Sequence, residues 1–217
     1  MASLNILVIG LGYFGESIAR EFAELGHETL GVDKDPDAVQ RNITVLTDTI
    51  EMDATNLDAL RTLNIPSYDI AVVGRGSNLE ESVLITLNLK ELGARHIVCK
   101  AQNESQKLIL ERIGAKHIVE PERDMGKRVA HILSAATNMI DYMDVPGDFA
   151  IEEMEVPRGW AGKNLSELQL PNRYGIQLLL VKSGEKFTAA PQPNFILQPN
   201  DIIVVFGHKL KLAQFKR

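Results

Sequence analysis

The feature that most constrains the fold of this chain lies near its start, where a short apolar run leads into a glycine-rich loop. Residues 4–9 precede Gly10-Leu11-Gly12-Tyr13-Phe14-Gly15, a Gly-x-Gly-x-x-Gly pattern, and a helical pattern begins at once. An acid, Asp33, ends the next apolar run, about 20 residues after the loop. A strand, loop, helix and acid in this order are typical of a nucleotide site, in which phosphates lie at a helix N-terminus.

Each glycine of the loop has its own role in such a site. Gly10 permits the tight turn, Gly12 lets the backbone approach a pyrophosphate, and Gly15 lets the helix pack closely on the strand. Asp33 accepts hydrogen bonds from a ribose 2′-hydroxyl, and its charge repels a 2′-phosphate. The alternative is a tight turn that binds no phosphate. The four features together favour the nucleotide site.

Residues 4–120 alternate short apolar runs with helical patterns, which predicts βα units on a parallel sheet. We expect strands at 4–9, 28–33, 44–50, 69–74, 96–100 and 117–119, and helices at 14–25, 35–42, 56–63, 78–92 and 104–113. The predicted fold class is α/β: a Rossmann-like, doubly wound parallel sheet, followed by a small α+β C-terminal domain.

The second part of the chain changes character. Apolar positions recur at helical spacing from Met125 to Met143, and Val145-Pro146-Gly147-Asp148 then predicts a linker. Strand-like runs at 150–156, 176–181 and 201–206 lie between turn residues, and a last helix follows Gly207. We predict three regions: a nucleotide-binding domain at 1–124, a helix and linker at 125–148, and a small domain at 149–217.

Composition excludes several classes of protein. A net charge of −6 over 217 residues argues against a nucleic-acid binder, and the single cysteine rules out an internal disulfide. No apolar run approaches the roughly 20 residues that span a bilayer, and no signal-peptide pattern opens the chain. We expect a cytoplasmic protein without direct membrane insertion, which meets a membrane only through a partner.

Polar residues follow the expected strands, at the sheet edge where ligands bind in such folds. Asp53-Ala54-Thr55 follows the third strand, where we expect an adenine, and Gly74-Arg75 follows the fourth. Lys100, after the fifth strand, places a cation near a terminal phosphate. Glu122, after the sixth, supplies a carboxylate for a divalent cation that bridges phosphates. The alternative for Glu122 is an acid that only stabilises a helix N-terminus.

The sequence carries no recognisable catalytic motif. It has no Gly-x-Ser-x-Gly elbow, no Walker lysine and no His-Glu-x-x-His, and its histidines lack the spacing of zinc ligands. Hydride transfer needs a proton donor in a substrate pocket, commonly in a substantial second domain, and here that domain is small. We therefore predict a protein that binds a nucleotide and is not an enzyme.

Several motifs together resemble those of a known family. They are the glycine loop, Val32-Asp33, Asp53-Ala54-Thr55, Lys100-Ala101-Gln102-Asn103, Ile113-Gly114-Ala115 and Pro121-Glu122-Arg123-Asp124-Met125-Gly126. This part resembles the RCK (Trk/Ktr) nucleotide-binding domain, TrkA-N. The motifs Gly162-Lys163-Asn164-Leu165, Tyr174-Gly175-Ile176 and Asn200-Asp201-Ile202 resemble the companion C-terminal domain, TrkA-C. The resemblance covers nearly the whole chain.

The resemblance implies a cytosolic regulatory subunit of a potassium uptake system that binds ATP, ADP or NAD(H). It implies a homodimer and an octameric ring beneath an integral-membrane K⁺ transporter, with a dimerisation and crossover helix at 125–148 and a regulatory domain at 149–217. By the same resemblance, the glycine loop with Tyr13 and Phe14 cradles phosphates, and Asp33 holds ribose beside Lys34. Glu122 matches a carboxylate that takes part in cation binding near the nucleotide.

Two positions depart from the family pattern. Relatives commonly carry an arginine that reaches a γ-phosphate where this chain has Tyr13, which leaves the choice among ATP, ADP and NAD(H) open. We hypothesise that Arg75 replaces the missing charge. In the C-terminal domain, Pro171 stands where relatives that bind cyclic di-AMP carry an arginine, with Arg173 nearby, so this ligand is less favoured.

Two alternative functions remain open at this stage. One is a small NAD-dependent oxidoreductase, against which the missing acid/base pair counts. The other is a regulator of another cation antiporter, since the same pair of domains occurs there.

Overall fold

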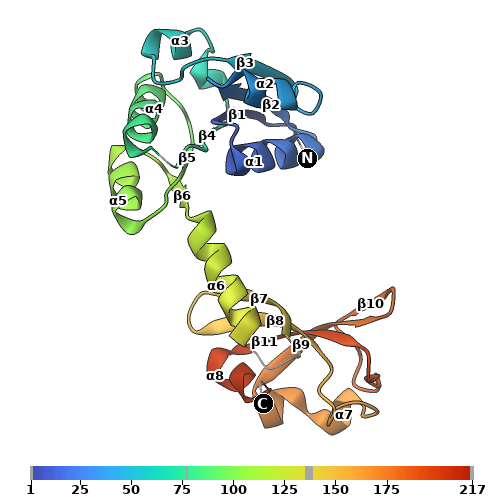
Figure 1. Ribbon diagram of the computed structural model, residues 1–217. Helices are drawn as coiled ribbons and strands as arrows, with labels where there is room; N and C mark the ends of the chain where they lie inside the picture. Colours follow the sequence, from blue (N-terminus) through green and yellow to red (C-terminus); the bar gives the residue numbers. More distant parts are fainter. Residues whose placement is uncertain (1, 77, 135–138, 216–217) are drawn as a thin grey trace. The chain divides into compact units, whose positions relative to one another are not determined.

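The computed structural model describes residues 2–76, 78–134 and 139–215. The chain divides into two compact units, which we call the N-terminal unit (Met1–Arg123) and the C-terminal unit (Asp124–Arg217). Each unit is built on a sheet of its own (Figure 1). The two units are therefore described separately.

The N-terminal unit alternates strands and helices along its whole length. In chain order, the elements are β1 (Asn5–Ile9), α1 (Tyr13–Glu24), β2 (Glu28–Asp33), α2 (Pro36–Asn42), β3 (Asp48–Glu51), α3 (Leu57–Arg61), η1 (Ile65–Ser67), β4 (Ile70–Val73), α4 (Leu79–Glu91), β5 (Ile97–Lys100), α5 (Glu104–Ile113) and β6 (His117–Val119). The strands form a parallel sheet in the order β3-β2-β1-β4-β5-β6. This is the doubly wound order predicted from the sequence.

Strand β1 is buried on both faces, as a central parallel strand requires. Successive side chains point to opposite faces, so Leu7 and Ile9 join one core cluster while Ile6 and Val8 join another. Helices α3, α4 and α5 contribute to the first cluster, and α1 and α2 contribute to the second. The sheet is thus covered on both faces, and its strand ends are left as the place for a ligand.

Side chains with an acceptor oxygen start several of these helices. Asp35, Asn56, Asn78 and Asn103 each accept a hydrogen bond from a backbone N–H in the first turn of the helix that follows. Such caps satisfy N–H groups that have no partner inside the helix. Helix α1 differs, because its N-cap is Gly12 and no side chain caps it.

The C-terminal unit begins within helix α6 (Pro121–Ser134) and is otherwise mainly antiparallel. Its further elements are β7 (Met139–Val145), β8 (Phe149–Glu155), α7 (Leu165–Leu168), η2 (Leu170–Tyr174), β9 (Ile176–Ser183), β10 (Lys186–Ala189), β11 (Ile202–His208), α8 (Lys209–Leu212) and η3 (Ala213–Phe215). The strands lie in the order β10-β9-β11-β8-β7. One face of this sheet packs on a core that includes Trp160, Leu197, Ile203 and Leu212.

The predicted helix from Met125 to Met143 is correct as far as Ser134 and wrong over its last residues, Met139 to Met143. Helix α6 is described to Ser134, and Met139–Val145 is a strand paired with β8. Pairing with β8 decides for the strand: Tyr142 is buried, whereas its neighbour Met143 points to the other face and is exposed. Positions 135–138 lie outside the described residues.

The predicted linker after this helix is also wrong, because the segment is a hairpin turn. Val145 pairs with Phe149, so β7 and β8 are joined directly. Gly147 has φ +76° and Asp148 has φ +47°, and these two residue types tolerate the left-handed region that a tight turn needs. Among the described residues, no helix is long and apolar enough to cross a membrane.

Candidate nucleotide-binding site

The glycine loop joins β1 to α1 at the carboxyl end of the parallel sheet. The Gly10 N–H donates to the Val32 carbonyl over 2.7 Å, and the Gly74 N–H donates to the Ile9 carbonyl over 2.8 Å. Gly10 has φ +91°, which favours glycine. A Cβ at Gly15 would overlap the carbonyl oxygen of Gly10, and one at Gly74 would lie 2.8 Å from the same oxygen. The loop therefore keeps its shape only with small residues around Gly10.

The N-terminus of α1 is open toward the crevice. Gly12 is its N-cap, with an extended backbone and no side chain to occupy the first N–H groups. A Cβ at Gly12 would meet nothing within 4 Å, and Tyr13 is fully exposed. Free N–H groups and the positive end of the helix dipole together suit an anion such as a phosphate.

Asp33 is buried at the end of β2 and anchors the loop. Its Oδ2 accepts a hydrogen bond from the Leu11 N–H over 2.7 Å, and its Oδ1 accepts one from the Asp35 N–H over 3.0 Å. A carboxylate has about four acceptor positions. Asp33 can therefore hold the loop and still accept a ribose hydroxyl.

The residues after β3 form a small turn beside the same crevice. Thr55 donates to Asp53 from its backbone N–H over 3.0 Å and from its hydroxyl over 2.7 Å. The hydroxyl bond, followed by the backbone bond, lowers the pKa of Asp53 below its usual value. Ala54 is buried in the core. The turn thus places an ionised carboxylate near Lys34 and Arg75.

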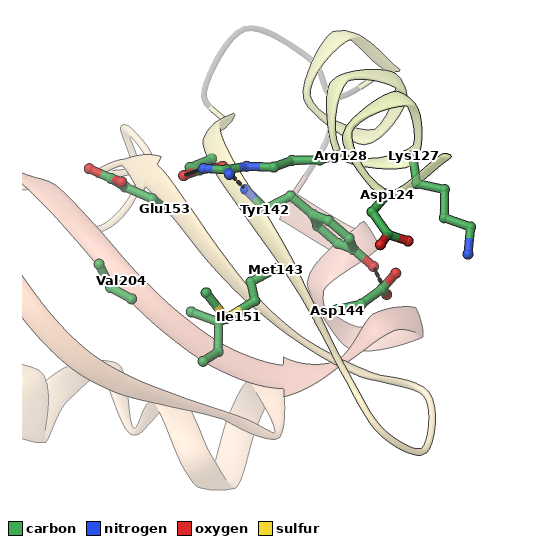
Figure 2. Close-up of a pocket in the computed structure, with 10 residues that line it drawn as sticks. Asp124, Lys127, Arg128, Tyr142, Met143, Asp144, Ile151, Glu153 and Val204 are labelled. Carbon is green, nitrogen blue, oxygen red and sulfur yellow. Dashed lines mark hydrogen bonds and ion pairs between the residues drawn. The ribbon is translucent and has the colours of Figure 1, made fainter. Parts of the chain in front are cut away.

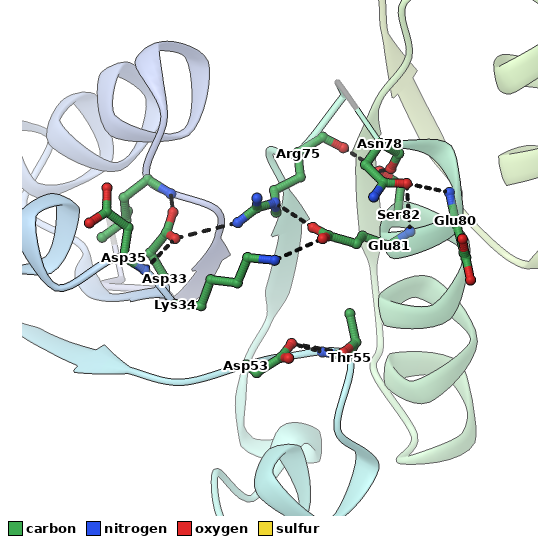
Figure 3. Close-up of polar contacts among 11 residues, drawn as sticks. Asp33, Lys34, Asp35, Asp53, Thr55, Arg75, Asn78, Glu80, Glu81 and Ser82 are labelled. Atoms are coloured by element: carbon green, nitrogen blue, oxygen red, sulfur yellow. Dashed lines mark hydrogen bonds and ion pairs between the residues drawn. The ribbon is translucent and has the colours of Figure 1, made fainter.

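Arg75 lies over the glycine loop and is held by two acids. Its Cγ is 2.5 Å from the place of a Cβ at Gly10, its Nη1 is 3.4 Å from Asp33 Oδ1, and its Nε is 2.8 Å from Glu81 Oε2. Ser82, in α4, donates to the Arg75 carbonyl oxygen. Figure 3 shows the guanidinium between the two carboxylates. No sequence motif singles out Glu81; only its position on α4 brings it here.

Lys100 and Glu122 meet at the other end of the crevice. The Lys100 Nζ lies 2.5 Å from Glu122 Oε1 and 5.8 Å from the centre of the Phe14 ring. The hydrogen bond from Lys100 lowers the pKa of Glu122. Within residues 2–76, 78–134 and 139–215, no group of three His, Cys, Asp or Glu side chains is placed to hold a metal ion. The divalent cation at Glu122 stays a prediction.

Most of these residues line two cavities that have Asp33, Lys34 and Arg75 in common. An open one of about 410 Å³ is lined by Gly12, Tyr13, Phe14, Asp33, Lys34, Gly74, Arg75, Lys100 and Glu122, among others. A narrow one of about 10 Å³ is lined by Gly10, Asp53, Ala54, Thr55 and Glu81, together with the three shared residues. The structure thus brings the predicted residues to one crevice. Gly15 lines neither cavity and acts by supporting the loop.

Two further cavities lie in the C-terminal unit. One has a volume of about 390 Å³ and lies between α6 and strands β7, β8 and β11. Among the residues that line it, Arg128 pairs with Asp141 and the Tyr142 hydroxyl donates to Asp144 (Figure 2). None of the predicted site residues lines it. Another, of about 430 Å³, is lined by Pro171, among others.

Comparison with known proteins agrees with this division of the chain. The TrkA-N domain model matches residues 6–121, and the TrkA-C domain model matches residues 151–217. The Ktr system potassium uptake protein C of Bacillus subtilis is 35% identical over 210 residues, which are 97% of this chain and 95% of that protein.

Solved structures show the same fold. The GsuK RCK domain has a TM-score of 0.69 at 19% identity, over 99% of this chain and 47% of that one. The GsuK channel bound to NAD has a TM-score of 0.67 at 20% identity, over 99% of this chain and 39% of that one. This chain thus spans less than half of either solved chain.

Proposed function

The chain belongs to the family of proteins that carry TrkA-N and TrkA-C domains, and we propose that it is a nucleotide-sensing regulatory subunit of a potassium uptake system. It binds ATP, ADP or NAD(H) in the crevice of the N-terminal unit. It acts in the cytoplasm on an integral-membrane potassium transporter and controls ion flux without catalysing a reaction.

The observation that carries this proposal is the open crevice around the glycine loop. It combines uncapped N–H groups at α1, a buried acid at Asp33 and a cation at Lys100. These are the groups that phosphates and a ribose need. The similarity to a Ktr potassium uptake protein over almost the whole chain supports the link to potassium transport.

The charges of the crevice support a proposal in which each end binds a different part of the ligand. Lys100 and the α1 N-terminus face phosphates, while Asp33 faces the ribose. Arg75 is paired with Asp33 and Glu81 on the ribose side, so the hypothesis that it replaces a charge missing at Tyr13 requires these pairs to open. All three ligands therefore belong in the test.

Nucleotide binding regulates a partner only if ligands differ in affinity for two states of the assembly. By the resemblance, that assembly is a homodimer and an octameric ring beneath the membrane partner. Cyclic di-AMP beside Pro171 is a second, weaker candidate ligand. The NAD named with the GsuK channel makes NAD(H) a member of the panel.

A thermal melting assay with ATP, ADP, NAD⁺, NADH and cyclic di-AMP tests the proposal. At about a hundred times Kd, a ligand stabilises the protein by roughly 2.7 kcal/mol. For a chain of this size we expect a rise of several degrees, at roughly 2–4 °C per kcal/mol. An Asp33→Asn variant should lose the response, and Asp37→Asn, at an exposed site in α2, should keep it.

Three results bear on the proposal in different ways. No response to any nucleotide contradicts it. A response that survives in Asp33→Asn places the ligand elsewhere. Oxidation of NADH with a carbonyl substrate would support an oxidoreductase instead.

A further inference from the structure

Glu81 links two cations that come from different parts of the N-terminal unit. Its Oε1 lies 2.8 Å from Lys34 Nζ, and its Oε2 lies 2.8 Å from Arg75 Nε. Arg75 also pairs with Asp33, with 3.4 Å between Arg75 Nη1 and Asp33 Oδ1. Figure 3 shows these four side chains converging from the ends of β2 and β4 and from the first turn of α4. Charges of opposite sign alternate along the chain of contacts.

This group surrounds the ribose end of the crevice. Asp33 ends β2, where an acid in this fold accepts a bond from the ribose 2′-hydroxyl. Lys34 is its neighbour in sequence, and the narrow cavity beside them is lined by Lys34, Arg75 and Glu81. Any group on the ribose 2′-oxygen therefore meets their charges.

The side chains around Asp33 could suit a ribose with a free 2′-hydroxyl or one with a 2′-phosphate. An acid at this place favours a free 2′-hydroxyl, and a nearby arginine accommodates a 2′-phosphate. This crevice has the acid and two cations. Both cations pair with Glu81, whose side chain is 19% exposed; water therefore screens the pair with Arg75, 27% exposed, less than the pair with Lys34, 45% exposed.

We infer that Glu81 is a selectivity residue: by neutralising Lys34 and Arg75, it makes the site accept adenine nucleotides with a free 2′-hydroxyl and reject those with a 2′-phosphate. The inference rests on the proposed nucleotide binding in this crevice. It adds that the selectivity comes from Glu81 together with Asp33, and that the two cations would otherwise bind a 2′-phosphate.

Two ligands that differ by one phosphate test the inference: AMP and adenosine 2′,5′-bisphosphate. We measure both dissociation constants by calorimetry on the full chain at about 0.1 M salt, where screening acts over about 10 Å. The wild-type protein should bind AMP more tightly. Glu81→Gln removes one negative charge at similar volume and should raise the relative affinity for the bisphosphate about tenfold.

Matched variants separate this effect from a general change of charge. Glu80→Gln removes the same charge from an exposed neighbour in α4 and should leave the ratio of the two constants within about twofold of the wild type. Lys34→Met in the Glu81→Gln background should return the ratio toward the wild-type value. Lys34→Met alone should lower the relative affinity for the bisphosphate, and this variant decides the matter if Glu81→Gln does not fold.

The outcomes distinguish the inference from the function on which it rests. If AMP binds and the ratio is the same in the wild type and in Glu81→Gln, the inference is overturned and the nucleotide site stands. An equal change in Glu80→Gln also overturns it. If the wild-type protein binds neither ligand nor any nucleotide of the melting panel, the proposed function fails and the inference fails with it.

Discussion

The two units of this chain use their sheets in opposite ways. In the N-terminal unit, helices cover both faces of a parallel sheet, and the candidate site lies where the strands end. In the C-terminal unit, one face of an antiparallel sheet packs on the core, while Met143 on the other face is 62% exposed. A parallel sheet with helices on both faces leaves the ends of its strands open to a ligand. An antiparallel sheet covered on one face leaves its other face open.

The polar groups follow the same division. At the strand ends of the N-terminal unit, Asp33, Arg75 and Glu81 converge on one crevice from three elements. In the C-terminal unit, Arg128 pairs with Asp141 beside a cavity formed against the sheet. Four changes test how far the two units are independent, from the largest expected effect to the smallest.

Gly15→Val should have the largest effect and should act on the N-terminal unit. The new Cβ overlaps the Gly10 carbonyl, a backbone atom that cannot move away cheaply, so we expect a loss of about 4 kcal/mol of unfolding free energy. Gly12→Ala is the control, because its Cβ meets nothing within 4 Å: stability should hold while nucleotide binding weakens. Denaturant unfolding and the melting panel measure both. Equal stability of the two variants would contradict the role of Gly15.

Ile203→Ala should weaken the C-terminal unit and leave nucleotide binding intact. Ile203 is fully buried in the core of that unit, and its truncation should cost about 3 kcal/mol. Hydrogen exchange should show faster opening of β8, β9 and β11, with unchanged protection of β1 and β4. Weaker ADP binding in this variant would show that the two units are coupled.

Lys100→Met should weaken binding without unfolding either unit. The lysine pairs with Glu122 at the phosphate end, and a lost charge-assisted hydrogen bond corresponds to roughly tenfold in Kd for ADP. Lys107→Met, a partly exposed lysine in α5, is the control. Equal affinities for ADP in the two variants would remove Lys100 from the site.

The smallest expected effect is the pH dependence of one ion pair in each unit. Lys100 lowers the pKa of Glu122 below 4.5, and Arg128 lowers that of Asp141 below 3.8. A lowered pKa means that the stability is present above the ordinary value and is lost as pH falls through the folded-state value. These pairs are partly exposed to water, which screens them, so we expect only a small contribution from each.

Acid titration of unfolding free energy compares the wild type with Glu122→Gln and Asp141→Asn. Each variant should be slightly less stable near pH 6, and the difference should vanish below the lowered pKa. A difference that persists at pH 2 would assign the effect to packing instead.

Most of the N-terminal unit was predictable because its signals are local. Nearby residues indicate the glycine with φ +91°, caps such as Asn78 and Asn103, and the burial of β1 from Ile6 to Ile9. The order of strands follows from the right-handed βα connections. The position of residues such as Asp53 and Lys100 at the ligand-binding edge of the sheet follows from that order.

The segment Met139–Val145 was not predictable in the same way. The helical spacing of the apolar positions before it continues into it as far as Met143, and only pairing with Phe149–Glu155 makes it a strand. Likewise, the turn at Gly147 has the same composition whether it separates two domains or joins two strands. The turn is recognised as part of a hairpin only when β7 and β8 are seen to pair with each other.

The sequence by itself determined the doubly wound sheet, the glycine loop and the acid that follows it, because backbone conformation and burial depend on nearby residues. Tertiary structure alone decided which charges meet. Lys34, Arg75 and Glu81 lie on separate elements, and their pairing depends on side-chain reach across the crevice. An ion pair of this kind needs its charged atoms within about 4 Å of each other, which no spacing along a sequence encodes.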